Sequence, residues 1–373
     1  MGKQDYSRQT FYILLILLTI VFGGIMKAAH SVSLPVIVSV LLACVCYPIV
    51  RRLNRQLRVP WAAGTILMAL VFVTVVTLLS SIIGTSLTTF LNQYSKYESR
   101  FLSIYKVFAD TLNLPFYDDK SFFENIWSQM KVREIVQQVA LSFSGNLISF
   151  AKSLGMVLLL MVFLLIEMRD GREKIDAVFR GKVQGRIMKI TKKIITETVR
   201  FISIKFFISL ATGVLVYVFL RIVRVDFAVM WGFFAFVMNF IPTFGSIFSV
   251  LLTTLFALLQ FYPALFPAVF VFVSLTLVNL IFGNILEPRI EGTNLGLSPF
   301  VILVSLLFWG WMWGFAGMIL AVPVMVVLKI ICENVSFLHG IAILLGNRPL
   351  ETLRELSAEE PDGAAEAQKP EER

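Results

Sequence analysis

Long runs of apolar residues constrain this sequence more than any other feature. Eight runs approach or exceed the roughly 20 residues that a bilayer-crossing helix needs. They cover residues 10–26, 32–50, 61–83, 147–168, 201–220, 227–261, 264–286 and 299–331. The chain is 57% hydrophobic and 15% charged, whereas a soluble domain carries about 25% charged residues. The sequence therefore predicts an all-α, polytopic membrane bundle with about eight transmembrane helices.

Two stretches hold most of the positive charge. Residues 51–58 contain four arginines and no acid, and residues 169–205 contain eleven Lys or Arg against four Asp or Glu. Loops rich in Lys and Arg stay in the cytoplasm, so we expect both termini on the cytoplasmic side. The net charge of +9 is then a consequence of topology and does not indicate nucleic-acid binding.

The polar segments divide the chain into five predicted parts. These are three transmembrane helices (1–83), a polar helical insert outside the cytoplasm (84–146), the fourth transmembrane helix with a basic amphipathic helix (147–200), a C-terminal transmembrane bundle (201–335) and an acidic, largely disordered cytoplasmic tail (336–373). Aromatic residues at helical spacing, including Tyr97, give the insert an apolar face. A capping-box pattern at residues 121–124 opens a second helix there.

The basic amphipathic helix suits an anionic lipid surface. Arg186, Lys189, Lys192 and Lys193 lie mostly off its apolar face, as in helices that rest on an anionic leaflet. These four residues are our candidates for lipid contact. The alternative is that their charge only sets the topology.

Motifs of enzymes are missing from the sequence. It has two His and three Cys, with no HExxH, CxxC or GxSxG spacing and no phosphate-binding loop. We therefore expect a protein that is not an enzyme, with no catalytic residue, metal or cofactor. Any active transport would need an ion gradient or a partner.

The sixth apolar run, residues 227–261, is interrupted near its middle. Pro242 lacks an N–H, and Gly245 permits backbone conformations that other residues avoid. Asn239 supplies an amide for the backbone groups that such a break frees. Transporters place broken helices of this kind at their substrate sites, so these three residues are candidates for a transport pathway. The alternative is a kink that only shapes packing.

The seventh run places polar groups inside and at the end of an apolar helix. Asn279 and Asn284 lie within it, and Glu287 and Arg289 lie at its predicted end beside Pro288 and Gly292. Ionisable groups in a membrane segment face water or one another. We expect these four polar side chains to line or gate a pathway. A salt-bridged turn at the membrane surface is the alternative.

The eighth run is rich in tryptophan and glycine. Gly310, Gly314 and Gly317 are interleaved with three Trp, and Pro323 follows. The spacing of Gly310 and Gly314 allows another helix to approach closely. These four residues are predicted to break the helix or to pack it tightly.

Together these motifs resemble the signatures of the autoinducer-2 exporter family, also called the PerM-like permeases. The motifs are NFIPTFG at residues 239–245, GNILEPRI at 283–290 with LGLS at 295–298, and the FWGW-to-VP segment at 308–323. They occur in the family's order across roughly residues 10–335. The resemblance implies a multi-pass protein of the bacterial cytoplasmic membrane that forms homo-oligomers, with a pathway in each protomer.

Three functions agree with these features. The leading interpretation is a transporter without its own ATPase that exports a small polar solute, with the quorum-sensing signal autoinducer-2 as the candidate. The second is a sodium(lithium)/proton antiporter, in which Glu287 would bind proton and cation in turn. The third is a membrane scaffold or regulatory protein that uses the insert and the basic helix. Expected partners are membrane lipid, the transported solute or ion, and further copies of the chain, but no nucleic acid.

Overall fold

The computed structural model describes residues 23–92, 132–179, 181–291, 296–335 and 338–346, together with Val21, Tyr97 and Arg100. Within these residues the chain is helical, with no β-strand. Six of the described helices are long and apolar enough to cross a membrane: His30–Gln56, Trp61–Ile82, Val183–Val223, Phe244–Phe261, Phe266–Ile290 and Pro299–Asn334. The predicted polytopic helical membrane bundle is confirmed.

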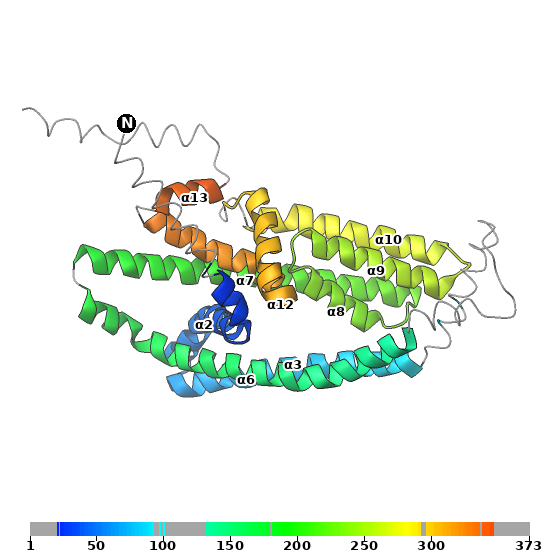
Figure 1. The fold of residues 1–373 in the computed structure, drawn as a ribbon, viewed down its shortest axis with the longest axis horizontal. Helices are drawn as coiled ribbons and strands as arrows, with labels where there is room; N and C mark the ends of the chain where they lie inside the picture. The colour runs from blue at the N-terminus through cyan, green and yellow to red at the C-terminus, as the bar shows by residue number, and fades with distance from the viewer. Residues whose placement is uncertain are drawn as a thin grey trace, which may run out of the picture.

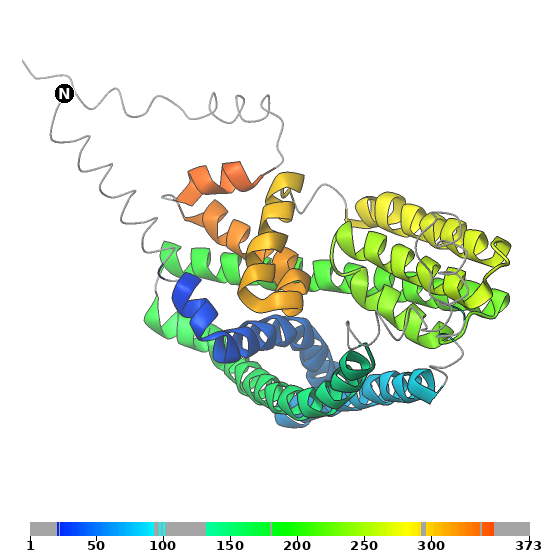
Figure 2. The ribbon, with the colours of Figure 1, turned by 45° about the vertical axis from the view of Figure 1, so that its right-hand side comes forward.

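The second half of the chain folds around one long helix, α7 (Lys182–Val223) (Figure 1). Three helices lie side by side along its C-terminal part, and with that part they form what we call the α7–α10 bundle (Figure 2). They are α8 (Ala228–Met238), α9 (Phe244–Phe261) and α10 (Phe266–Asn279). Its core consists of small and medium apolar side chains, including Ala235, Ala257 and Val271.

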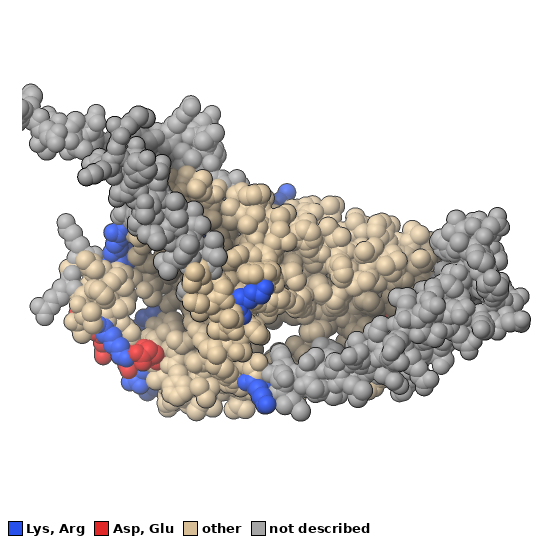
Figure 3. All heavy atoms as spheres, in the orientation of Figure 1, with Lys and Arg blue, Asp and Glu red and all other residues tan. Residues whose placement is uncertain are grey.

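Five further helices are described outside residues 182–291, of which α2, α6 and α12 contact α7. They are α2 (His30–Gln56), α3 (Trp61–Asn92), α6 (Val132–Val178), α12 (Pro299–Asn334) and α13 (His339–Leu345). Helices α2, α3 and α6 contact one another, and α12 contacts α2, α7 and α13. Figure 3 shows a face over α9 and α10 that is almost free of charged side chains, as a bilayer-facing surface requires.

The eight predicted spans map onto the described helices unequally. Most of the first span, residues 10–26, lies outside the described residues, and the fourth, residues 147–168, is part of the 47-residue helix α6. The insert's capping box also lies outside them. Tyr97 is described: it is buried, and its hydroxyl donates to Asp226 Oδ2 at 2.7 Å, which ties the insert to the end of the α7–α10 bundle.

Both long runs are broken helices, as predicted. The sixth run forms α8 and α9, joined by a turn at residues 239–243, where Thr243 has a φ of 64°. The eighth run forms α12, whose backbone leaves helical geometry at Trp313 and Gly314. Pro323, predicted to break the helix or to pack it tightly, is buried inside the second arm of α12, and the helix continues past it to Asn334.

The seventh run differs from the prediction at its end. Helix α10 passes into a π-helix, η1 (Leu280–Leu286), and then into α11 (Glu287–Glu291). Pro288 therefore does not end the helix, contrary to the sequence-based expectation. It lies in the first turn of α11, where a proline's missing N–H and fixed φ are tolerated.

Candidate functional site

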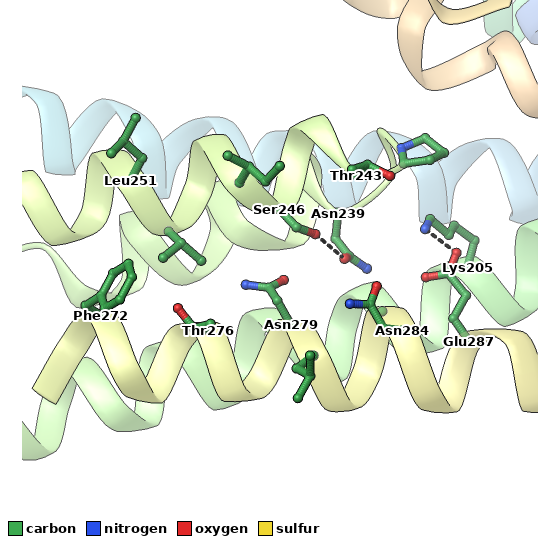
Figure 4. Close-up of a pocket in the computed structure, with 15 residues that line it drawn as sticks. Lys205, Asn239, Thr243, Ser246, Leu251, Phe272, Thr276, Asn279, Asn284 and Glu287 are labelled. Carbon is green, nitrogen blue, oxygen red and sulfur yellow. Dashed lines mark hydrogen bonds and ion pairs between the residues drawn. The ribbon is translucent and has the colours of Figure 1, made fainter. Parts of the chain in front are cut away.

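A cavity of about 470 Å³ lies among α9, α10, η1 and α7, beside the turn that joins α8 to α9 (Figure 4). Its polar lining comes from α7, α9, α10, η1, α11 and that turn, and consists of Lys205, Asn239, Thr243, Ser246, Thr276, Asn279, Asn284 and Glu287. Apolar side chains such as Leu251 and Phe272 line the end farthest from Lys205 and Glu287. The sequence predicted four of the eight polar residues: Asn239, Asn279, Asn284 and Glu287.

The broken helix positions the first wall of the cavity. Asn239 caps the end of α8 and is 4% exposed. Its Nδ2 donates to Ser209 Oγ at 2.9 Å, and its Oδ1 accepts from Ser246 Oγ at 3.4 Å. The amide therefore joins α7 to the first turn of α9. Pro242 lines the cavity from the turn itself.

Gly245 acts through packing rather than through the cavity lining. It is buried at the start of α9, and a Cβ there would overlap the carbonyl oxygen of Met238 at the end of α8. Only glycine lets the two helices meet at this angle. The predicted trio thus divides: Asn239 and Pro242 line the cavity, while Gly245 holds the turn closed.

The π-helix η1 aligns the opposite wall. In an α-helix, Asn284 would point about 140° away from Asn279, because five residues exceed one full turn. In the π-helix, backbone bonds join residues five apart, as between the Glu287 N–H and Phe282 O. Both amides consequently point into the cavity.

The two amides differ in what they already bind. Asn279 Nδ2 donates to Leu275 O at 2.9 Å, which leaves its carbonyl oxygen as an acceptor. Asn284 makes no hydrogen bond within the described part of the protein. Both can therefore offer polar atoms to a solute.

A buried ion pair closes one end of the cavity. Lys205 Nζ lies 2.5 Å from Glu287 Oε1, with the two side chains 3% and 17% exposed. Charges so deep in a membrane segment need a partner. The partner of Glu287 is therefore Lys205 on α7, not Arg289, which the sequence also allowed; Arg289 is exposed and does not line the cavity.

Lys205 is the charged lining residue that the sequence reasoning missed, along with the hydroxyl residues Thr243, Ser246 and Thr276. It counted there among the eleven cytoplasmic bases of residues 169–205. A usable signal was present, because apolar residues flank it on both sides from Phe201 to Phe207, apart from one serine. A lone charge inside such a run is a functional candidate by itself.

The glycines of α12 build a second break rather than a helix–helix contact. Gly314 has a φ of 62° with open space around it, so it serves the turn. A Cβ at Gly317 would overlap the Trp309 carbonyl, and one at Gly310 would meet Met318. All of these contacts lie within α12. Trp309 and Trp313 stack at the break with ring centroids 4.7 Å apart.

The predicted lipid-facing bases fall into two groups. Arg186 donates to the Asn334 carbonyl, and Lys193 Nζ lies 2.8 Å from Glu333 Oε2, so both contact the end of α12. Lys189 and Lys192 are exposed. Lipid contact stays a prediction for all four bases. Gly292, the remaining predicted residue, lies outside the described residues.

The cavity offers amides, hydroxyls and one ion pair. In the ranges given above, no group of three or more His, Cys, Asp or Glu is arranged to hold a metal ion. Neutral hydrogen-bonding groups suit a polar solute, and the Lys205–Glu287 pair adds a site where charge could be exchanged.

Comparison with known proteins places these features in a family context. Residues 11–337 match the family described as AI-2E family transporter. The chain is 31% identical to a putative transport protein of Borreliella burgdorferi over 350 residues, 90% of each chain. It is 28% identical to the AI-2 transport protein TqsA of Escherichia coli over 343 residues, which is 90% of this chain and 95% of TqsA. The matched range contains all three sequence motifs.

Proposed function

The chain belongs to the AI-2E transporter family, and from this premise we propose that it exports a small polar solute through the cavity beside Asn239. Membrane transport follows from the family, as does a multi-pass bacterial membrane protein. The cytoplasmic membrane, cytoplasmic termini and outward direction are part of the proposal. AI-2 is the first solute to test, because the E. coli relative is named for it.

One observation carries the proposal: polar side chains from separate elements converge on a single cavity in an otherwise apolar bundle. Asn239 comes from the broken helix, Asn284 from the π-helix and Lys205 from α7. Polar groups in a membrane interior are unfavourable unless they are paired or used. The unpaired amide of Asn284 is therefore the strongest candidate for direct solute contact.

Flux through purified protein in liposomes tests this function. We expect AI-2 to cross membranes that contain the wild-type protein, and Asn284→Ala to slow its passage about tenfold, since one lost hydrogen bond in the transport barrier has that effect. The matched control is Asn54→Ala, because Asn54 is exposed and bonds only the Val59 carbonyl, away from the cavity.

Two outcomes would contradict the proposal. If neither AI-2 nor any tested ion moves, transport through this cavity is wrong. If Asn284→Ala and Pro242→Ala are silent while deletion of residues 84–146 abolishes a cellular phenotype, the scaffold interpretation is favoured.

Cation/proton exchange is a second candidate, favoured by the Lys205–Glu287 pair. Glu287 borders the cavity and is already neutralised by Lys205, so a bound cation would have to displace the lysine. We expect Glu287→Gln to abolish sodium- and lithium-dependent proton flux in liposomes if this function holds. Wild-type exchange by that variant would exclude Glu287 as the exchanging group.

A further inference from the structure

The interior of the α7–α10 bundle contains polar atoms that the cavity does not explain. Across the described residues, six buried side-chain N or O atoms lack a hydrogen-bond partner, and four of them belong to this bundle: Thr212, Trp231, Thr253 and Thr254. Thr212 and Thr253 are 1% and 0% exposed. The unpartnered groups thus concentrate in the bundle that adjoins the cavity.

Stability alone does not account for these threonines. A buried hydroxyl without a partner loses its hydration and gains nothing in return. Valine has nearly the same shape without the hydroxyl, and the core around them already contains Val216, Val250 and Val271. The hydroxyls of Thr212 and Thr253 therefore point to a partner from outside the protein, and water is the simplest one.

The hydroxyls continue rows that begin at the cavity. On α7, Ser209 and Thr212 follow Lys205 at spacings of four and three, which is one helical face. On α9, Ser249 and Thr253 follow Ser246 at spacings of three and four. The four residues that lie beyond the cavity are all buried: Ser209, Thr212, Ser249 and Thr253.

The α9 row ends in a polar cluster at the far end of the bundle. Gln260 is 7% exposed and lies seven residues beyond Thr253. Its Oε1 accepts from the Asp226 N–H at 2.7 Å, and its Nε2 donates to Arg224 O at 3.0 Å. Polar groups thus stand at both ends of the bundle.

Asn239 stands where the cavity meets the bundle interior. Its amide accepts from Ser246, which lines the cavity, and donates to Ser209, which is fully buried on the interior side. A rotation of this one side chain would break both bonds and remove the contact that separates the cavity from the buried hydroxyls.

We propose that Thr212 and Thr253 line a water path that runs from the Lys205–Glu287 pair past Asn239 to the cluster at Asp226. The proposal rests on the transport function and locates the route by which protons reach the ion pair. A water molecule needs two to four polar partners in such a place, and a hydroxyl both donates and accepts. Water enters when α8 shifts against α7, a small sliding movement of packed helices.

Helices α7 and α8 approach each other closely beside Thr212. Gly213, next to Thr212, faces Gly232, next to Trp231, and a Cβ on either glycine would fall within 2.8 Å of the other's carbonyl oxygen. The Cβ atoms of Phe236 and Tyr217 border the same contact, at 2.8 and 2.9 Å from these two positions, so a shift of α8 against α7 also moves these side chains.

Proton flux in liposomes with an internal pH-sensitive dye tests the path. Under an imposed pH gradient, we expect Thr212→Val/Thr253→Val to reduce protein-dependent flux about tenfold, whereas Thr212→Ser/Thr253→Ser retains it. The double valine variant should melt at or above the wild-type temperature, because it loses only unpartnered hydroxyls. Wild-type flux through the valine variant would overturn the proposal.

A matched control is Thr65→Val, because Thr65 is 0% exposed but its hydroxyl already donates to Trp61 O at 2.9 Å. We expect this variant to keep wild-type flux. A loss as large as that of the double variant would show that any buried Thr→Val change slows transport, and would also overturn the proposal.

Radiolytic hydroxyl-radical labelling separates this path from the proposed function, since it reports water beside a side chain without any transport. We expect oxidation of Trp231 in the wild-type protein and several-fold less in the double valine variant. Trp61, whose Nε1 donates to Leu165 O at 2.8 Å, should be unchanged. If the wild type moves nothing, the transport function fails and the Trp231 labelling alone decides the path. An unlabelled Trp231 would overturn it.

Discussion

Two helix breaks, one at residues 239–243 and one at Trp313–Gly314, are built alike but surrounded differently. In each, a glycine of the second arm lies against a carbonyl at the end of the first: Gly245 against Met238, and Gly317 against Trp309. The first break opens onto the polar cavity. The second is filled by stacked indoles and buried apolar side chains.

The difference shows that a broken membrane helix is not by itself a solute site. Both breaks free backbone groups, but only at the first do polar side chains from several other elements, namely Lys205, Asn279 and Asn284, converge on a cavity. At the second, Trp313 Nε1 donates to Ser33 Oγ of α2 at 3.1 Å and the space is packed. Convergence of side chains distinguishes the pathway candidate from a structural kink.

The largest effect should come from the feature that both breaks share. We expect Gly245→Ala and Gly317→Ala each to destabilise the protein by about 3 kcal/mol, because the new Cβ overlaps backbone that cannot yield. Thermal melting in detergent, with folded yield, measures the loss. Gly155→Ala is the control, because nothing lies within 4 Å of a Cβ there. Equal stability of all three variants would show that the close contacts are not required.

A second test uses the Lys205–Glu287 ion pair, which lies at the cavity beside the first break. Lys205→Met should abolish flux and destabilise the protein by about 3 kcal/mol, because it leaves the partly buried Glu287 carboxylate unpaired. The double variant Lys205→Met/Glu287→Gln should recover most of the stability but not the flux. Melting temperatures and liposome flux measure the two effects. If the single and double variants melt together, the ion pair does not hold this end of the cavity.

The smallest effect should sharpen the contrast. Trp313→Phe removes the hydrogen bond to Ser33 and part of a buried, stacked indole, so it should cost about 2 kcal/mol of stability and leave flux unchanged. Asn239→Ala also removes hydrogen bonds at a break but should cut flux strongly. Both variants are compared by melting and by flux normalised to incorporated protein. A flux loss in Trp313→Phe equal to that in Asn239→Ala would assign both breaks to the pathway.

The sequence indicated the bundle and both breaks because these depend on local chemistry. Apolar runs require helices in a bilayer, and Pro242 with Gly245 interrupts one whatever surrounds it. Pro288 misled by the same logic, because the π-helix before it depends on how the segment packs. A proline in the first turn of a new helix looks, in the sequence, like the end of an old one.

Contacts between residues far apart in the sequence were the part of the site that local sequence patterns could not predict. Arg289 is two residues from Glu287, while Lys205 is 82 residues away, yet Lys205 is the partner. Gly314 was expected to support helix packing, but its positive φ shows that it serves a turn. In both cases the sequence identified a residue that matters locally, but it did not identify which residues lie beside it in the folded protein.

The π-helix makes the cavity sensitive to how this segment is wound. Residues 280–286 contain a wider turn than an α-helix, and each residue of an α-helix rotates the following side chains by about 100°. Rewinding the segment as an α-helix, with no residue removed, would turn Asn284 and Glu287 away from Asn279 and Lys205 although every lining side chain was still present. Deleting one residue between Asn279 and Asn284 would restore the match, because a spacing of four leaves the two amides about 40° apart. A family member with one residue fewer in this segment could therefore keep the cavity with an ordinary α-helix.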